Sequence, residues 1–215
     1  MLKLAIIGSG HLGLQVVHHA IQTRQFSIAG FYDDFQQVGT MVSGVPVLGN
    51  IANVSQAYSD GLFDTVIMAI GYNHLKFKQT VFHSLKDKNI PFATIIHPDA
   101  YIDPTAKIGA GSIIYPGCTI DMNVEVGENS LINCGCTIAH DSKIGESCFL
   151  SPEVKIAGFT HVSSLVILGI GSVIVDNIFI TANTRVGAGS LVTKPITESG
   201  IYYGSPAKFI RKIEG

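Results

Sequence analysis

The second half of the chain carries a hydrophobic repeat of six residues. An aliphatic residue returns at every sixth position without interruption, and the residue four positions later is small or β-branched each time. The aliphatic positions are Ile102, Ile108, Ile114, Ile120, Val126, Ile132, Ile138, Ile144, Leu150, Ile156, Val162, Leu168, Ile174, Ile180, Val186 and Val192. A short fixed period is typical of a solenoid, in which each repeat packs only against its neighbours, and it predicts a β-helix.

The first half, up to about residue 98, has a different pattern. Short apolar runs alternate with segments of helical spacing, such as Leu12, Val16 and Ala20. The pattern predicts strands over 3–7, 28–32, 65–70 and 92–96, a short extended piece over 45–48, and helices over 11–23, 51–58 and 74–85. Strands that alternate with helices favour βαβ units and a parallel sheet, here smaller than a complete dinucleotide-binding domain. We therefore expect a small Rossmann-like α/β domain over 1–98 and a β-helix domain over 99–215.

The repeat resembles that of the hexapeptide acyltransferases, whose fold is a left-handed parallel β-helix. The resemblance implies three six-residue repeats to each triangular coil, so that residues eighteen apart stack on coils about 4.8 Å apart. It places the aliphatic column in the interior and the small column at tight corners. Three of the four cysteines, Cys118, Cys136 and Cys148, belong to the small column, so we interpret them as packing residues.

Composition narrows the classes of function. Hydrophobic residues make up 47% and charged residues 14% of the chain, which excludes a disordered protein. The net charge of −2 argues against nucleic acid as a partner. The apolar run at 4–7 is too short for a secretory signal, no run approaches a membrane span, and the cysteines have no zinc-site or redox spacing. We therefore expect a cytoplasmic protein without membrane insertion.

A glycine motif links the first predicted strand to the first helix. The segment Gly8-Ser9-Gly10-His11-Leu12-Gly13 matches G-x-G-x-x-G in the strand-to-helix context that gives this motif its meaning. Its glycines let backbone N–H groups approach a phosphate at a helix N-terminus. Asp33 and Asp34 follow about 20 residues later, where an acid can bind a ribose hydroxyl. The motif predicts nucleotide binding, and the alternative is a turn that only packs helix against strand.

One of the eight histidines stands out by its place in the repeat. The residue stacked next to His140 is Gly158, which is expected to leave an open notch beside the imidazole. Asp141 follows directly and can fix the tautomer of the ring. Acyl transfer from a thioester needs a base and a donor for the developing oxyanion. We predict His140 as general base, Asp141 as its orienting partner and the Gly158 amide as oxyanion donor. His161 lies in another column, so no metal site is expected.

Four further motifs resemble one family along essentially the whole chain. They are Ser9-Gly10-His11, Tyr32-Asp33-Asp34, Ala69-Ile70-Gly71-Tyr72-Asn73 and Ile96-His97-Pro98. They are similar to those of bacterial UDP-amino-sugar N-acetyltransferases and the related sialic-acid O-acetyltransferase-like proteins, in which a His followed by Glu or Asp, and a Gly one coil later, have the roles given above. The resemblance implies that the substrate binds Gly8, Ser9, Gly10, His11, Asp33, Asp34, Gly71 and Asn73. Two positions depart from the family pattern: Lys76 replaces an expected Arg, and Phe149 replaces a second His near the acetyl group.

The late repeats and the tail carry the coenzyme A prediction. Two repeats, 168–172 and 186–190, are rich in glycine and are expected to leave a shallow groove for a pantetheine arm. The segment 203–208 resembles the Gly-x-Pro-Ala-Lys tail of hexapeptide acyltransferases, although a solenoid also needs a cap at its open end. The expected contacts of acetyl-CoA are Gly158, Gly169, Ile170, Ala188, Gly204, Pro206, Ala207 and Lys208.

Together these features favour an acetyl-CoA-dependent N-acetyltransferase that acts on the amine of a UDP-linked amino sugar. Sugar O-acetylation needs the same His–Asp pair and stays open as an alternative. A non-catalytic nucleotide-binding scaffold is less favoured because it has no use for the notch and the tail together. An NAD-linked function is disfavoured because a β-helix has no usual part in hydride transfer. The resemblance also implies a homotrimer with active sites between neighbouring subunits.

Overall fold

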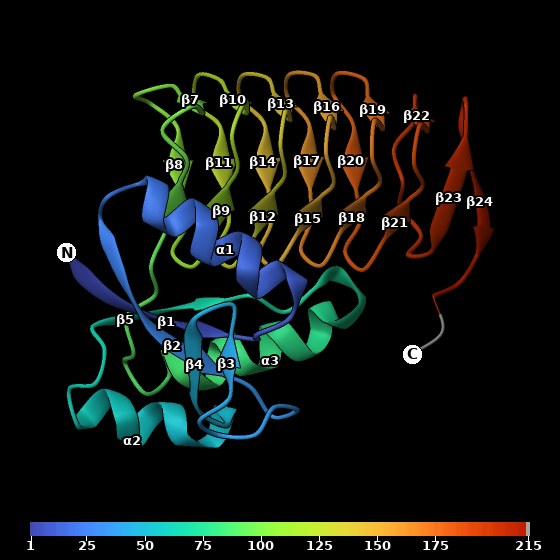
Figure 1. Cartoon of the computed structure of the whole chain (residues 1–215). Helices are drawn as coiled ribbons and strands as arrows, with labels where there is room; N and C mark the ends of the chain where they lie inside the picture. Colours follow the sequence, from blue (N-terminus) through green and yellow to red (C-terminus); the bar gives the residue numbers. More distant parts are fainter. Residues whose placement is uncertain (214–215) are drawn as a thin grey trace. The chain divides into compact units, whose positions relative to one another are not determined.

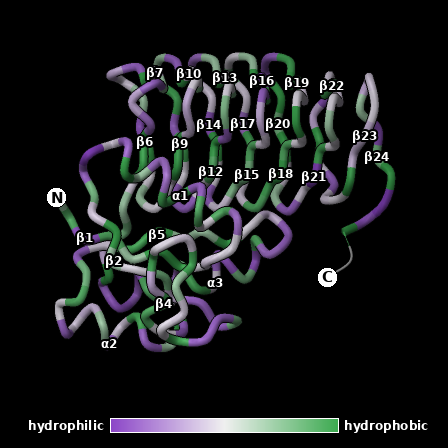
Figure 2. Tube along the Cα trace, viewed as in Figure 1, coloured by the Kyte–Doolittle hydropathy of each residue, from purple (hydrophilic) through white to green (hydrophobic). Residues whose placement is uncertain are grey.

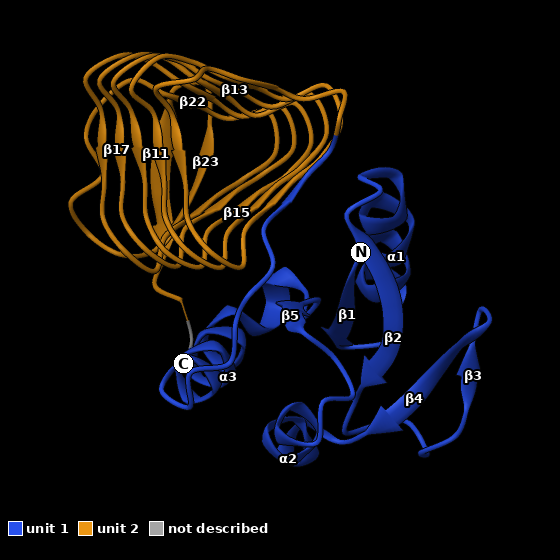
Figure 3. Cartoon of the chain, turned by 90° about the vertical axis from the view of Figure 1, so that its left-hand side faces the viewer, with its two compact units in different colours: residues 1–97 blue, residues 98–215 orange. Residues whose placement is uncertain are grey.

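The structure, a computed structural model, describes residues 1–213 of the 215-residue chain. Residues 214 and 215, the end of the expected second domain, lie outside the described residues. The chain separates into two compact units, Met1–His97 and Pro98–Gly215 (Figure 3). The assignment of nucleotide-sugar binding to the first unit and acyl transfer to the second remains a prediction at this point.

The first unit is built on a mixed five-stranded sheet. Its strands are β1 (Leu2–Ile7), β2 (Phe26–Tyr32), β3 (Met41–Val42), β4 (Val45–Gly49) and β5 (Thr65–Met68), in the order β3-β4-β2-β1-β5 (Figure 1). β1 pairs in parallel with β2 and β5, and β2 pairs in parallel with β4, whereas β3 and β4 form an antiparallel hairpin. The parallel core confirms the predicted Rossmann-like fold class.

Helices cover both faces of this sheet. They are α1 (His11–Gln22), α2 (Val54–Ser59) and α3 (Leu75–Lys86), with the 3₁₀ turns η1 (Ile51–Asn53) and η2 (Tyr72–His74) leading into α2 and α3. Successive side chains of β2 point to opposite faces of the sheet. Tyr32 belongs to the buried cluster formed with α2 and α3, whereas the Phe31 ring lies 3.2 Å from where a Cβ would stand on Gly13 of α1. The helix predicted over 51–58 therefore exists, but it begins as a 3₁₀ turn.

The strand predicted over 92–96 is reduced to two short pieces. Val66 N of β5 donates to Pro91 O at 3.0 Å, and Val66 O accepts from Ala93 N at 2.8 Å, after which this pairing ends. Pro91 has no N–H with which to extend the ladder towards α3. Strand geometry returns only at β6 (Ile95–Ile96).

Three histidines gather in the first unit around its last residue. The rings of His18 and His19 on α1 lie 5.1 Å apart and those of His19 and His97 lie 5.3 Å apart, both edge to face. The Gln22 side chain is hydrogen-bonded to His18 Nε2 at 2.7 Å and to His97 Nε2. Burial, followed by the charges of His18 and His97, lowers the pKa of His19 to about 4. The folded protein therefore keeps His19 neutral well into the acidic range.

We expect this cluster to make the protein less stable in mildly acidic solution. The pKa of His19 is about 4 in the folded protein, against a reference value of 6.5, so the unfolded chain takes up this proton first as the pH falls. The native state therefore loses stability between about pH 6.5 and about pH 4, and this residue adds no further loss below that window. Melting temperatures of the wild type and His19→Asn across this range provide the test. The variant should show the flatter profile, and parallel profiles would contradict the assignment.

The second unit is a parallel β-helix of two-residue strands, as the six-residue repeat predicted. The strands are β7 (Tyr101–Ile102), β8 (Lys107–Ile108), β9 (Ile113–Ile114), β10 (Thr119–Ile120), β11 (Glu125–Val126), β12 (Leu131–Ile132), β13 (Thr137–Ile138), β14 (Lys143–Ile144), β15 (Phe149–Leu150), β16 (Lys155–Ile156), β17 (His161–Val162), β18 (Ile167–Leu168), β19 (Val173–Ile174), β20 (Phe179–Ile180), β21 (Arg185–Val186) and β22 (Leu191–Val192). One sheet contains β7-β10-β13-β16-β19-β22, a second contains β8-β11-β14-β17-β20, and a third contains β9-β12-β15-β18-β21. Each strand pairs with the strand three places later, as Thr119 does with Thr137, which confirms that residues eighteen apart stack.

Both predicted columns lie inside this β-helix. Aliphatic residues such as Ile120 and Ile138 are fully buried, and hydrophobic residues recur at matching points of successive coils (Figure 2). The small column also satisfies the backbone at the corners. Ser130 Oγ donates to Gly145 O at 2.9 Å and accepts from Cys148 N at 3.0 Å, so one hydroxyl is bonded to two residues of the next coil.

The buried cysteines act in the same way. Cys118 Sγ donates to Asn133 O at 3.0 Å, and Cys136 Sγ donates to Ser151 O at 3.1 Å. All four cysteines are free thiols. Serine and cysteine in this column thus both donate to the next coil, whereas β-branched members such as Val124 and Val154 are buried there without a group to donate.

Candidate active site

His140 lies in the turn between β13 and β14, and its neighbour in sequence orients it. His140 Nδ1 is 3.0 Å from Asp141 Oδ2, and Asn123 Nδ2, one coil earlier, donates to Asp141 Oδ1 at 3.0 Å. Asn123 and Asp141 both have left-handed backbone, with φ of 58° and 57°, a conformation that Asn and Asp adopt more readily than most residues. The turn therefore presents a carboxylate, with both oxygens engaged, to one nitrogen of the imidazole.

Asp141 is held as an ionised acceptor. The hydrogen bond with His140, followed by that from Asn123, lowers the pKa of the Asp141 carboxyl below its usual value. Because an ionised carboxylate only accepts, Nδ1 of the neutral imidazole carries the proton and Nε2 has a free lone pair. Nε2 makes no hydrogen bond to any other described residue, and 44% of the His140 side chain is exposed. The geometry suits a general base that awaits an acceptor.

Gly158 stacks beside His140, but the predicted open notch is absent. A Cβ on Gly158 would lie 2.8 Å from Cε1 and 2.9 Å from Nε2 of His140, because the imidazole itself lies over the glycine. The missing side chain thus makes room for the base rather than for a reacting carbonyl. Within residues 1–213 the Gly158 N–H makes no hydrogen bond, whereas Glu146 N in another repeat donates to Ser164 Oγ. The Gly158 amide is thus not engaged by another described residue, and its role as oxyanion donor stays a prediction.

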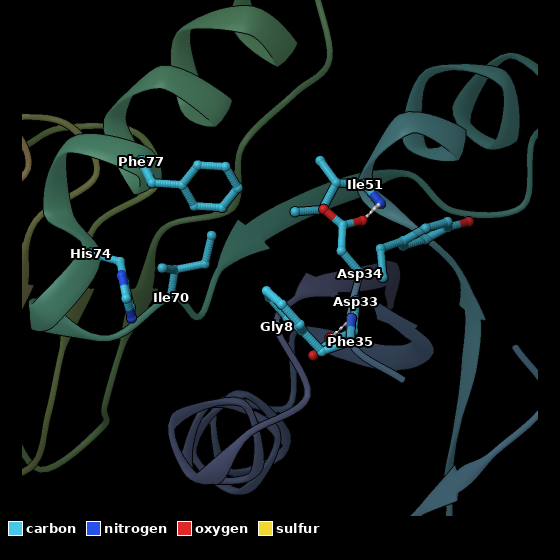
Figure 4. Close-up of a pocket in the computed structure, with 9 residues that line it drawn as sticks. Gly8, Asp33, Asp34, Phe35, Ile51, Ile70, His74 and Phe77 are labelled. Atoms are coloured by element: carbon cyan, nitrogen blue, oxygen red, sulfur yellow. Dashed lines mark hydrogen bonds between the residues drawn. The ribbon is translucent and has the colours of Figure 1, made fainter. Parts of the chain in front are cut away.

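A second candidate site lies at the carboxyl ends of β1, β2 and β5 in the first unit. A cavity of about 270 Å³ is lined by Gly8, Tyr32, Asp33, Asp34, Phe35, Ile51, Ile70, His74 and Phe77 (Figure 4). Open α/β sheets bind their ligands at this edge. Gly8 has φ of +105°, and a Cβ on it would lie 2.8 Å from Ala69 O. Glycine is therefore required where the ends of β1 and β5 approach each other.

Asp33 holds the glycine loop in place. Its Oδ2 accepts from both the N–H and the hydroxyl of Ser9 at 2.7 Å each, and its Oδ1 accepts from Phe35 N at 2.8 Å. Burial by itself would raise the pKa of Asp33, but these hydrogen bonds outweigh it and hold the pKa below the usual value. Asp33 is thus ionised and already engaged by the protein.

Asp34 uses only one of its two carboxylate oxygens in hydrogen bonds to described residues. Its Oδ1 accepts from Ile51 N at 2.8 Å, and its Oδ2 makes no hydrogen bond within the part of the chain that the structure describes. The side chain is exposed at the cavity (Figure 4). Asp34 is therefore better placed than Asp33 to accept a hydrogen bond from a ligand.

The predicted substrate residues divide into two groups. Those that line the cavity are Gly8, Asp33 and Asp34. Those that do not are Ser9, Gly10, His11, Gly71 and Asn73. His74 and Phe77 line it instead, from the segment where η2 leads into α3, and Ile70 lies on the same side (Figure 4). These side chains were not predicted because the glycine motif specifies backbone geometry and not the opposite wall of the cavity.

Two glycines of the late coils, Gly169 and Gly187, are needed for packing, whereas Gly171 and Gly189 border open space. A Cβ on Gly169 would lie 2.5 Å from Ala188 N of the next coil, and a Cβ on Gly187 would overlap the Tyr203 ring. The space over these two glycines is therefore filled by the protein itself and cannot hold a ligand. Ile170 is exposed, and so is Ala188, which follows it by one coil. The surface around Gly171, Gly189, Ile170 and Ala188 is therefore left for a ligand.

The tail forms a hairpin after the last coil. β23 (Ile201–Gly204) pairs in parallel with β21 and in antiparallel fashion with β24 (Ala207–Arg211). Gly204 has φ of +106° and starts the turn through Pro206 into Ala207. Lys208 is exposed and makes no ion pair with another described residue. The hairpin thus adds two strands to one sheet and leaves a cation open to an anionic ligand.

Two residues beside His140 were not predicted from the sequence, namely Asn123 and Phe159. They stack above and below Asp141 in its eighteen-residue column, and Phe159 also contacts the His140 ring. The repeat therefore contained the signal that places them in the site, although nothing in the repeat indicated their roles.

No helix within the described residues is long and apolar enough to cross a bilayer. Residues 1–213 also contain no group of three or more His, Cys, Asp or Glu side chains placed to hold a metal ion.

Known proteins share both units of this chain. The family model of the PglD N-terminal domain matches residues 3–85, and no curated protein matches. The acetyltransferase domain of PglB from Neisseria gonorrhoeae FA1090 is 25% identical, with a TM-score of 0.90 over 98% of this chain and 100% of that one. PerB from Caulobacter crescentus, in complex with CoA and GDP-perosamine, is 28% identical, with a TM-score of 0.88 over 97% of both chains. WeeI from Acinetobacter baumannii AYE, at 23% identity and a TM-score of 0.82 over 98% of this chain and 100% of that one, has the same fold.

These matches confirm the resemblance that the sequence motifs indicated. The family model covers most of the first unit, and the similarity to the PglB domain and to PerB extends through the β-helix to the tail. Residues 3–85 therefore match the PglD N-terminal domain family, and the chain as a whole is similar in sequence and fold to the PglB acetyltransferase domain and to PerB.

Proposed function

We propose that the chain transfers the acetyl group of acetyl-CoA to the amino group of a UDP-linked amino sugar, with His140 as the general base. The family supports the acetyltransferase activity, since PerB was solved with CoA and GDP-perosamine and the PglB domain with acetyl coenzyme A. The observation that carries the catalytic assignment is the 3.0 Å contact between His140 Nδ1 and Asp141 Oδ2, with Nε2 unengaged over Gly158.

Each residue of this site has a role in one step of the proposed reaction. The amine nitrogen attacks the thioester carbonyl carbon while His140 Nε2 takes a proton from the amine. The carbonyl oxygen becomes an oxyanion, which the Gly158 N–H stabilises, and Asp141 stabilises the imidazolium. The tetrahedral intermediate then collapses, the C–S bond breaks, and the imidazolium returns its proton to the leaving thiolate. The products are the N-acetylated sugar and CoA with a free thiol.

The size and lining of the cavity in the first unit favour a nucleotide with a single-ring base. Its volume of about 270 Å³ lies at the small end for ligand pockets. Ile51, Ile70 and Phe77 supply apolar walls, and the unengaged oxygen of Asp34 can accept from the N3–H of uracil. A purine is the competing outcome, because PerB was solved with a GDP-linked sugar.

We extend the proposal to acetyl-CoA binding and assembly. Exposed Ile170, Ala188 and Lys208 are proposed to contact acetyl-CoA, together with the turn at Gly204–Ala207. The β-helix also exposes large apolar residues, among them Met122 and Phe179. A homotrimer that covers them is proposed to complete the active site with residues from a neighbouring subunit.

Release of the CoA thiol from acetyl-CoA tests the function against a panel of acceptors. The panel contains UDP-linked amino sugars, the matching UDP-hexoses and GDP-perosamine. We expect turnover with UDP-amino sugars and none above background with the UDP-hexoses, which offer only hydroxyls. Turnover of UDP-hexoses would identify a sugar O-acetyltransferase, and turnover of GDP-perosamine alone would contradict the choice of nucleotide. Tight binding of NADH without any response to UDP-sugars would contradict the proposal as a whole.

A further inference from the structure

One turn of the β-helix places a phenylalanine where its stacked neighbours have Asn or Asp. Phe159 has φ of 56°, and the residues above and below it, Asn123, Asp141 and Asn177, have φ of 58°, 57° and 58°. Asn and Asp tolerate this left-handed region, whereas a bulky aromatic residue there is an outlier. Burial does not account for it, because 56% of Phe159 is exposed. A strained residue that gains little from burial indicates a functional role.

The aromatic ring of Phe159 contacts the candidate base. The ring centroids of Phe159 and His140 lie 5.1 Å apart with an interplanar angle of 87°, the edge-to-face arrangement that aromatic pairs favour. Phe159 N also donates to His140 O at 3.1 Å, which ties the two coils together at this point. Asp141 holds the imidazole at Nδ1, and Gly158 lies beneath it. Phe159 is therefore a third neighbour of the imidazole, beside Asp141 and Gly158.

We propose that Phe159 is a positioning residue that keeps His140 Nε2 directed at the acceptor amine. The inference rests on the proposed role of His140 as base. A single hydrogen bond to Asp141 leaves the imidazole free to swing about that bond, and the contact with Phe159 removes this freedom. Small errors in the placement of a catalytic group are costly. Loss of the ring should therefore lower kcat and leave the KM for acetyl-CoA unchanged.

Phe159→Asn gives a sharp test, because Asn is the native residue at the stacked positions 123 and 177. It relieves the backbone, so the melting temperature should stay the same or rise, while kcat falls by about tenfold. Phe159→Tyr keeps the aromatic ring and should retain kcat to within about twofold. Leu165→Asn is the matched control, since Leu165 is another bulky residue with left-handed backbone, at φ of 60°, in a different turn. It should leave kcat unchanged. Turnover is measured with the panel acceptor that the wild type uses fastest.

A measurement without acceptor separates this proposal from the function of His140. The ring current of Phe159 should shift the NMR resonance of His140 Cε1–H, assigned with a His140→Gln variant, and Phe159→Asn should remove that shift. Wild-type kcat in Phe159→Asn, an equal loss in Leu165→Asn, or an unmoved imidazole resonance would overturn the positioning role. Full activity in His140→Gln would overturn the proposed function, and the positioning role with it, even if the resonance moves as expected.

Discussion

His140→Asn should lower kcat by about a hundredfold or more, the usual contribution of a positioned general base. The asparagine side chain is polar and can lie near Asp141, but it has no basic nitrogen that takes up a proton near neutral pH. The acceptor amine must then lose its proton to water. Because His140 is not among the proposed contacts of the nucleotide, binding of the sugar nucleotide in the first unit should persist.

Steady-state release of the CoA thiol measures this effect, with melting temperatures to show that the fold is intact. His83→Asn is the matched control, because His83 is an exposed histidine on α3 outside the lining of the nucleotide cavity. It should keep wild-type kcat. A His140→Asn protein with wild-type turnover would refute the assignment of the base.

Gly158→Ala is expected to reduce kcat by about a hundredfold as well, through geometry rather than through loss of a reactive group. The new Cβ would stand 2.8 Å from Cε1 and 2.9 Å from Nε2 of His140, so the imidazole has to move away from its position. Gly158 does not have the left-handed backbone that disfavours alanine, so the fold itself should tolerate the change.

A double-mutant cycle shows whether the loss in Gly158→Ala acts through the base. In the His140→Asn background the imidazole is absent, and adding Gly158→Ala should cost little more. The same hundredfold loss in that background would show that the added methyl group disturbs the site independently of the histidine, because alanine keeps the backbone N–H proposed as oxyanion donor. The single variant and the cycle therefore show whether the loss acts through the imidazole.

The β-helix was predictable because its six-residue period is uninterrupted. The resemblance to hexapeptide acyltransferases implied that three repeats close one coil, and this fixes which residues stack. From that stacking, the sequence places His140 and Asp141 next to Gly158. The alternation of short strands with helices likewise predicted most of the first unit.

The directions of side chains could not be predicted in this way. A missing side chain at Gly158 and at Gly187 suggested open space, but the rings of His140 and Tyr203 fill it, because a ring packs wherever a neighbour leaves room. The acidic pair after β2 looked equivalent in the sequence, yet the hydroxyl and N–H of Ser9 engage one member and leave the other open to a ligand. The direction of a side chain and its hydrogen-bond partner depend on which groups meet in the folded structure, and a local sequence pattern does not contain this information.

The corner hydroxyls and thiols of the β-helix also restrict how this fold can evolve. Ser130 is bonded to two residues of the next coil, so inserting or deleting one residue would set every following donor against the wrong partner. Gain or loss of an entire turn of the solenoid would keep these bonds, and so would exchange of outward-facing residues. New acceptor specificities are therefore expected to arise by point changes on the outer surface of an otherwise conserved scaffold, without any redesign of the core.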